Sequence, residues 1–184
     1  MGLIFNEKKA TQAAVRFLKL SGGTMNYMIL IKDLYLLDRA ALLNWGRLVT
    51  CDDIYEMKLG PVLSQVHDLI TEQQEEETIW QRCISRSHFD VTLKEDPGND
   101  ELSAAEEEMI DNIFATYGHY KDPFQFAKLL HKILPELKGI ERGRSELKFG
   151  DILRAENKSP EEIESISNEI EAVGHIEALL AAKD

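Results

Sequence analysis

The chain has 184 residues, which is enough for one substantial hydrophobic core and too few for two comfortable domains. Its composition is 43% hydrophobic and 29% charged, which excludes a disordered chain, and it lacks the roughly 18-residue apolar run of a membrane span. The net charge is −12, and residues 160–184 carry seven acids against one base, so the surface disfavours direct nucleic-acid binding and favours a basic partner.

The first part of the chain is predicted to contain two helices. A first helix over residues 8–20 ends at the Ser-Gly-Gly sequence of residues 21–23, which is typical of a helix stop followed by a turn. Thr24 is expected to cap a second helix, which runs to about Asn44 and ends at Gly46.

The middle of the chain is predicted to contain one short extended segment, one helix and a hairpin. Residues 53–59 form the extended segment, and Pro61 then opens a helix over residues 61–70, because proline suits the first helical turn. Residues 78–84 and 88–93 are the two strand candidates, and the second of them alternates as a half-exposed strand does.

The second half carries several helix-start signals. They lie at the capping box of Ser103 and Glu106, at Asp122-Pro123, at Phe149 and at Ser159-Pro160. The predicted fold is therefore mostly α (α+β): a single compact helical domain over residues 1–184 with a small β-hairpin. The C-terminal helix over residues 160–182 has an isoleucine stripe that packs on this domain or on a partner, with a homodimer seam as one alternative.

Asp38 interrupts the apolar sequence of the second predicted helix. At about 100° per residue its side chain falls on the same face as Leu34 and Tyr35, toward the core. An ionised carboxylate in a core is costly unless it is paired or hydrogen-bonded. We therefore expect a structural acid, bonded to the free N–H groups of a helix start at Gly60-Pro61 or paired with an arginine; the alternative is a polar group that lines a ligand or partner cleft.

Several short motifs follow one another in a fixed order. They are KDLYLLD at Lys32–Asp38, Gly46 with Thr50 and Asp52, MKLGPV at Met57–Val62, and LLHKILP at Leu129–Pro135. Their order and spacing resemble the Panacea domain of SocA-like antitoxins, a phage-associated family. Its usual motifs are K-x-L-Y-L-A-D, G-x-x-x-T-x-D, G-P-V and H-x-x-x-P, so Leu37 departs from the common alanine.

The resemblance implies an antitoxin of a toxin–antitoxin system, which neutralises a cognate protein toxin by direct binding. The acidic surface of the chain favours a basic toxin. The resemblance also implies that the signature residues maintain or line the cleft used for partner binding: Tyr35, Asp38, Asp52, Gly60, Pro61 and His131.

A second hypothesis is a small-ligand-binding protein or hydrolase-like enzyme that uses Asp38 with His67 or His131, provided that folding brings these groups together. No zinc, nucleophile-elbow or phosphate-loop motif supports it, so we expect no enzyme, no catalytic residue, no metal and no cofactor. Two cysteines and an N-terminus without a secretory signal predict a reduced, cytoplasmic protein.

Overall fold

The structure is a computed structural model that describes residues 4–181. Its helices are α1 (Glu7–Leu20), α2 (Tyr27–Trp45), α3 (Ser64–Thr71), α4 (Ile79–Cys83), α5 (Ala104–Tyr117), α6 (Pro123–Ile133), α7 (Phe149–Ala155) and α8 (Pro160–Ala181). Its strands are β1 (Thr24–Asn26), β2 (Ile54–Met57), β3 (Gly60–Leu63), β4 (Ile84–Ser87), β5 (Asp90–Leu93) and β6 (Arg144–Glu146). The predicted fold class, mostly helical with small β elements, is confirmed.

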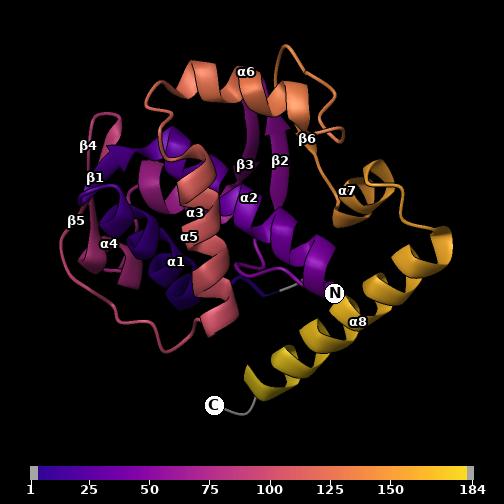
Figure 1. The fold of residues 1–184 in the computed structure, drawn as a ribbon. Coiled ribbons are helices and arrows are strands. Elements are labelled where there is room, and N and C mark those ends of the chain that lie inside the picture. The colour runs from indigo at the N-terminus through magenta and orange to yellow at the C-terminus, as the bar shows by residue number, and fades with distance from the viewer. Residues whose placement is uncertain (1–3, 182–184) are drawn as a thin grey trace.

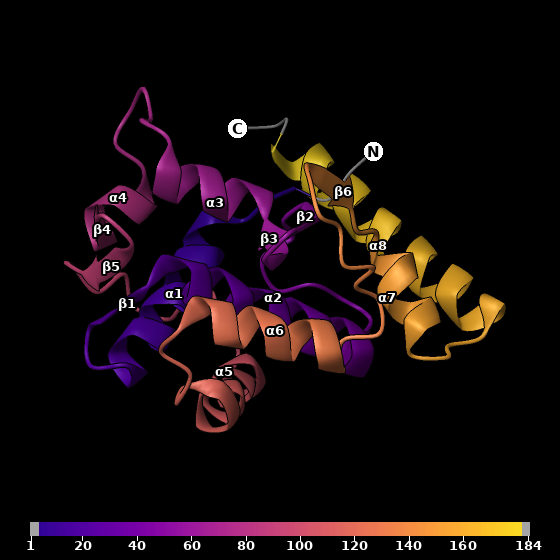
Figure 2. The ribbon, with the colours of Figure 1, turned by 90° about the horizontal axis from the view of Figure 1, so that it is seen from above.

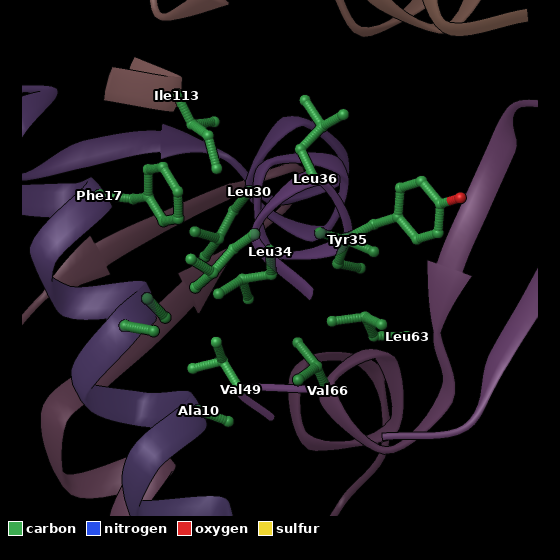
Figure 3. Packing of buried hydrophobic residues seen from close by; sticks show 14 of the residues in the cluster. Ala10, Phe17, Leu30, Leu34, Tyr35, Leu36, Val49, Leu63, Val66 and Ile113 are labelled. Atoms are coloured by element: carbon green, nitrogen blue, oxygen red, sulfur yellow. The ribbon is translucent and has the colours of Figure 1, made fainter. Parts of the chain in front are cut away.

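Helix α2 lies at the centre of the molecule, with α1, α5, α6 and β3 around it (Figures 1 and 2). Every residue from 29 to 38 is buried, because the sequence of this helix is apolar on nearly all sides. Figure 3 shows its residues Leu30 and Leu34 packed between Phe17 of α1 and Leu63 of β3. Any charged side chain on this stretch of α2 is therefore buried with it.

Two small antiparallel sheets flank this core. One has the strand order β1-β5-β4 and the other β3-β2-β6. The prediction that Thr24 caps α2 is wrong, because Thr24 pairs with Thr92 in the first sheet. Asn26 caps the helix instead: its side-chain oxygen accepts a hydrogen bond from the N–H of Met28 at 3.0 Å. The predicted helix end is confirmed, since Gly46 has a left-handed φ of 66°.

The prediction that Pro61 opens a helix is wrong. Residues 60–63 form β3, which pairs with β2 in a hairpin where Glu56 lies opposite Pro61, and α3 starts only at Ser64. Proline is tolerated there because β3 is an edge strand of its sheet. Gly60 has a φ of +97°, a conformation that favours glycine at the end of this tight turn.

The predicted strand over residues 78–84 is also wrong for most of its length. Thr78 and Gln81 form a capping box that starts the short helix α4, and strand β4 follows from Ile84. The hairpin itself is present but shifted, because it joins β4 to β5 through a turn at which His88 has a φ of 57°. Residues 85–87, which separate the two predicted strands, lie inside β4.

The predicted starts of the later helices are confirmed at Ser103, Asp122, Phe149 and Pro160. Helix α8 lies along the margin of the molecule beside α7 (Figures 1 and 2). Its residue Ile166 packs over the C-terminus of α2, 3.5 Å from where a Cβ of Gly46 would lie. No helix within residues 4–181 combines the length and the apolar character needed to cross a membrane.

Candidate functional site

Asp38 fastens the loop after α2 to the helix itself. Its Oδ1 atom accepts the N–H groups of Val49 and Thr50 at 2.7 and 2.9 Å, and its Oδ2 atom accepts the Thr50 hydroxyl at 2.5 Å. The residue is completely buried, as its helical phase predicts. The expected bond to the Gly60-Pro61 segment is wrong, because that segment is a strand and offers no helix N-terminus.

Asp52 holds the helix N-terminus that was expected for Asp38. Its two carboxylate oxygens accept the N–H groups of Gln65 and Val66, each at 2.9 Å, in the first turn of α3. Burial raises the pKa of both Asp38 and Asp52 to about 6, although their hydrogen bonds favour the ionised form. The two carboxylates thus bind the backbone segments that precede and follow the β2–β3 hairpin in the chain.

Tyr35 belongs to a different cluster, which joins α2 to the segment after α6. Its hydroxyl donates to Oε1 of Glu136 at 2.5 Å, and Arg39 donates to the same carboxylate at 2.7 and 3.1 Å. Arg39 also pairs with Glu156 at the end of α7. Burial raises the pKa of Glu136, but the Arg39 guanidinium and the Tyr35 hydroxyl outweigh it and hold that pKa below its ordinary value. The cluster links α2 to the segments that follow α6 and α7.

Sequence reasoning missed Arg39 and Glu136 as members of this cluster. Both residues lie next to recognised motifs, which could have identified them as candidates: Arg39 directly follows the KDLYLLD motif, and Glu136 directly follows Pro135. The sequence does not show that Arg39 and Glu136 form a pair, because they lie 97 residues apart in the chain.

Gly60 and His131 come together with Lys32. A Cβ on Gly60 would lie 3.7 Å from Cε of Lys32 and 4.0 Å from Nε2 of His131. Lys32 is buried, donates to the backbone oxygen of Met28 at 3.3 Å, and has its pKa lowered to about 8 by burial. The described contacts of the signature residues fall into three sets: Asp38 and Asp52 bind backbone N–H groups of residues 49, 50, 65 and 66, Tyr35 binds Glu136, and Gly60 lies beside Lys32 and His131.

The grouping required by the enzyme hypothesis is not observed. The described hydrogen bonds of Asp38 go to residues 49 and 50 and include no imidazole. On α3, the Nδ1 atom of His67 lies 3.4 Å from Oδ1 of Asp68 and 3.3 Å from Oγ1 of Thr71. His131 borders a shallow pocket of about 360 Å³ that also includes Lys58 and Lys138.

A larger hollow lies where α8 crosses the loop after α2. It has a volume of about 580 Å³, and we call it the α8 groove; its lining includes Ile4, Phe5, Trp45, Leu48, Ile170 and Val173. Next to it the C-terminal half of α8 leaves large apolar side chains exposed. Val173, Ile176 and Leu179 are 51, 57 and 54% exposed, whereas Ile170 one turn earlier is 5% exposed.

The structure defines a mostly α-helical protein whose motif residues Asp38 and Tyr35 link the central helix α2 to the loop at residues 48–51 and to Glu136. A family model described as "Antitoxin SocA-like, Panacea domain" matches residues 30–134, more than half of the chain. The chain belongs to this family, as its resemblance predicts. No curated protein and no solved structure matches the chain.

The matched residues have a clear place in the fold. They run from the first turn of α2 to the residue after α6, and so include Asp38, Asp52, Gly60 and His131. Glu136, α7 and α8 lie beyond the matched residues. The family match therefore covers a large part of the core but not the buried face of α1, and the α8 groove is lined partly by residues on both sides of the match.

Proposed function

We propose that the protein is the antitoxin of a toxin–antitoxin system, and that it neutralises a basic protein toxin in the cytoplasm by direct binding at the α8 groove. The observation that carries this proposal is the apolar surface that runs from the groove to the exposed end of α8. It joins Ile4 and Trp45, which are 41 and 36% exposed, to Val173, Ile176 and Leu179. Contiguous exposed apolar residues of this kind mark protein interaction sites.

The size of this surface suits a specific contact. Complete burial of a large apolar side chain stabilises a complex by about 1.5–3 kcal/mol, so side chains that are half exposed contribute roughly 1 kcal/mol each. Trp45 lies at the rim of the groove, and tryptophan is enriched among the residues that dominate binding energies. These side chains supply an apolar centre for the interface.

Charge determines the kind of partner. Helix α8 carries six glutamates and neither lysine nor arginine over residues 160–181. The groove lining also includes Lys9 and Arg47, but both pair with Glu106, so the excess of negative charge beside the apolar centre comes from α8. An acidic helix beside an apolar centre favours a basic protein by steering its approach and by penalising acidic competitors. The proposal assigns no catalytic role to the chain, because Asp38 and Asp52 use their carboxylates to bind backbone N–H groups.

Co-expression tests the proposal. The full chain is expressed together with the product of the adjacent gene, and growth and co-purification are scored. We expect the neighbouring product to arrest growth when expressed alone, and the full chain to relieve the arrest by forming a stable complex. A harmless neighbour that forms no complex contradicts the antitoxin role.

A paired substitution tests the surface. Ile176→Glu should abolish rescue and co-purification without changing the melting temperature, because the side chain is 57% exposed. Phe124→Glu is the matched control, since Phe124 is 62% exposed at the start of α6 and should leave rescue intact. Equal rescue by both variants excludes the α8 surface. If Ile176→Glu instead splits a homodimer and still rescues, the surface binds a second copy of this chain.

A further inference from the structure

Asp33 is a buried acid without a hydrogen-bond partner among the described residues. It is 1% exposed, and neither of its carboxylate oxygens has a hydrogen-bond partner among the described residues. Other buried acids have such partners: Glu106, for example, binds Lys9 and Arg47 at 2.9 and 2.6 Å. A desolvated carboxyl group that has no donor is costly, and such groups are rare in native proteins.

Asp33 lies in the wall of a small cavity of about 60 Å³. The cavity lies between β1, the start of α2 and the end of α5, and its other walls include Asn26, Phe114, Tyr120 and Lys121. One water needs about 10–15 Å³, so this volume holds roughly four non-hydrogen atoms. A drug-sized ligand does not fit.

The electrostatics of the cavity favour an added positive charge. Burial raises the pKa of Asp33 to about 8, and the neighbouring charges of Lys32 and Lys121 counteract this only in part. Lys32 directs its hydrogen bond to the backbone oxygen of Met28 instead. A cation that enters the cavity ionises the carboxyl group and gains a strong, poorly screened partner.

We propose that this cavity binds a primary ammonium group that comes from outside the chain. An ammonium group offers three donors, enough for both oxygens of Asp33, and the rings of Phe114 and Tyr120 supply aromatic walls of the kind that attract cations. Among residues 4–181, no three histidine, cysteine, aspartate or glutamate side chains are grouped to hold a metal, so the carboxylate and the rings suit an amine better than a metal ion.

The site is separate from the α8 groove. Asp33 and Trp45 are twelve residues apart on α2, which places them about 18 Å apart along the helix axis. The ammonium group comes from one of two sources with the same chemistry, a lysine side chain of a protein or a free alkylamine. The inference goes beyond the proposed function, and it stands or fails independently of toxin binding.

Calorimetry with n-butylammonium on the full-length protein tests the proposal at neutral pH. We expect saturable binding to the wild type, with 1-butanol as the uncharged control that does not bind. Binding should release a proton, because Asp33 is protonated in the free cavity and ionised beside the amine. The measured heat should therefore depend on the ionisation enthalpy of the buffer.

Variants identify the group that binds. Asp33→Asn keeps the size of the side chain and should weaken n-butylammonium binding at least about tenfold, or about 1.4 kcal/mol. Carbon NMR of the wild-type Asp33 carboxyl group gives a second readout that needs no variant: added amine should shift it to the ionised form. Equal binding to Asp33→Asn, or an unchanged carboxyl resonance, overturns the proposal.

Two further measurements distinguish the possible sources of the ammonium group. Tighter binding of Nα-acetyl-lysine amide than of n-butylammonium supports a protein lysine, and the reverse order supports a free alkylamine. Lys121→Ala tests whether the chain fills its own cavity. If only this variant binds amines, Lys121 is the native occupant and the proposal of an external ammonium group is overturned.

Discussion

The acids of α2 show how strongly a single residue depends on its surroundings. Asp38 and Asp33 lie five residues apart on one helix and both are buried, yet Asp38 has three donors and Asp33 has none among the described residues. The difference arises from the loop at residues 48–51, which turns its N–H groups toward Asp38. A buried carboxylate that is satisfied by backbone groups acts as a structural link.

Removal of the Asp38 carboxylate tests this structural role. Asp38→Ala should lower the free energy of unfolding by roughly 1–3 kcal/mol, because the buried N–H groups of Val49 and Thr50 lose their acceptor. Chemical denaturation measures the loss, with Asp53→Ala as an exposed control that should change little. An unchanged midpoint together with lost partner binding contradicts the structural role and places Asp38 on a functional surface.

The sequence predicts that Asp38 is buried but not which groups it binds. Helical phase is a local property, so the burial of this side chain follows from its neighbours on α2. Its partners depend on how the loop at residues 48–51 returns to the helix, which is a tertiary property. For the same reason the motif around Asp52 does not reveal that its carboxylate accepts the first N–H groups of α3.

At the scale of elements, the prediction succeeded where a side chain marks a helix start. Ser103, Asp122 and Ser159 each lie directly before a helix in the structure. It failed at Pro61, because proline suits an edge strand as well as a first helical turn, and pairing with β2 decides between them. Strand pairing over long separations, such as Tyr55 with Glu146, leaves no local signal.

A substitution at Gly60 tests how much its backbone conformation contributes to the stability of the β2–β3 hairpin. Gly60→Ala should destabilise the protein by roughly 1–3 kcal/mol, because its φ of +97° is strained for any residue with a Cβ. Gly22→Ala is the matched control: Gly22 has a φ of +88°, and nothing lies within 4 Å of an added Cβ. Similar losses in thermal denaturation indicate backbone strain alone. A much larger loss at Gly60 contradicts that view and indicates that Lys32 and His131 cannot accommodate the methyl group.

At the scale of the whole molecule, charge and apolar surface are unevenly distributed. Residues 1–50 carry seven bases against three acids, whereas α8 has six glutamates and no lysine or arginine. This acidic helix is also the one that leaves apolar side chains exposed at its end. A basic partner would therefore be attracted to the same region in which it can bury apolar surface.

This distribution predicts a salt-dependent association rate with the proposed basic toxin. Between about 0.01 M and about 0.1 M salt the Debye length shortens from roughly 30 to roughly 10 Å, so steering by α8 should weaken and the association rate constant should fall by about tenfold or more. Stopped-flow mixing of the two purified proteins measures the rate. The dissociation rate should change much less, because it depends mainly on the apolar centre of the interface.

Substitution of glutamate by glutamine identifies the charges that speed association. Glu169→Gln with Glu171→Gln on α8 should slow association at low salt, since both side chains are exposed and Glu169 lines the α8 groove. Glu72→Gln with Glu75→Gln removes the same charge from the exposed connection between α3 and α4, and should have a smaller effect. If both pairs slow association equally, net charge rather than the acidic surface of α8 guides the partner. If association is independent of salt, the partner is not basic.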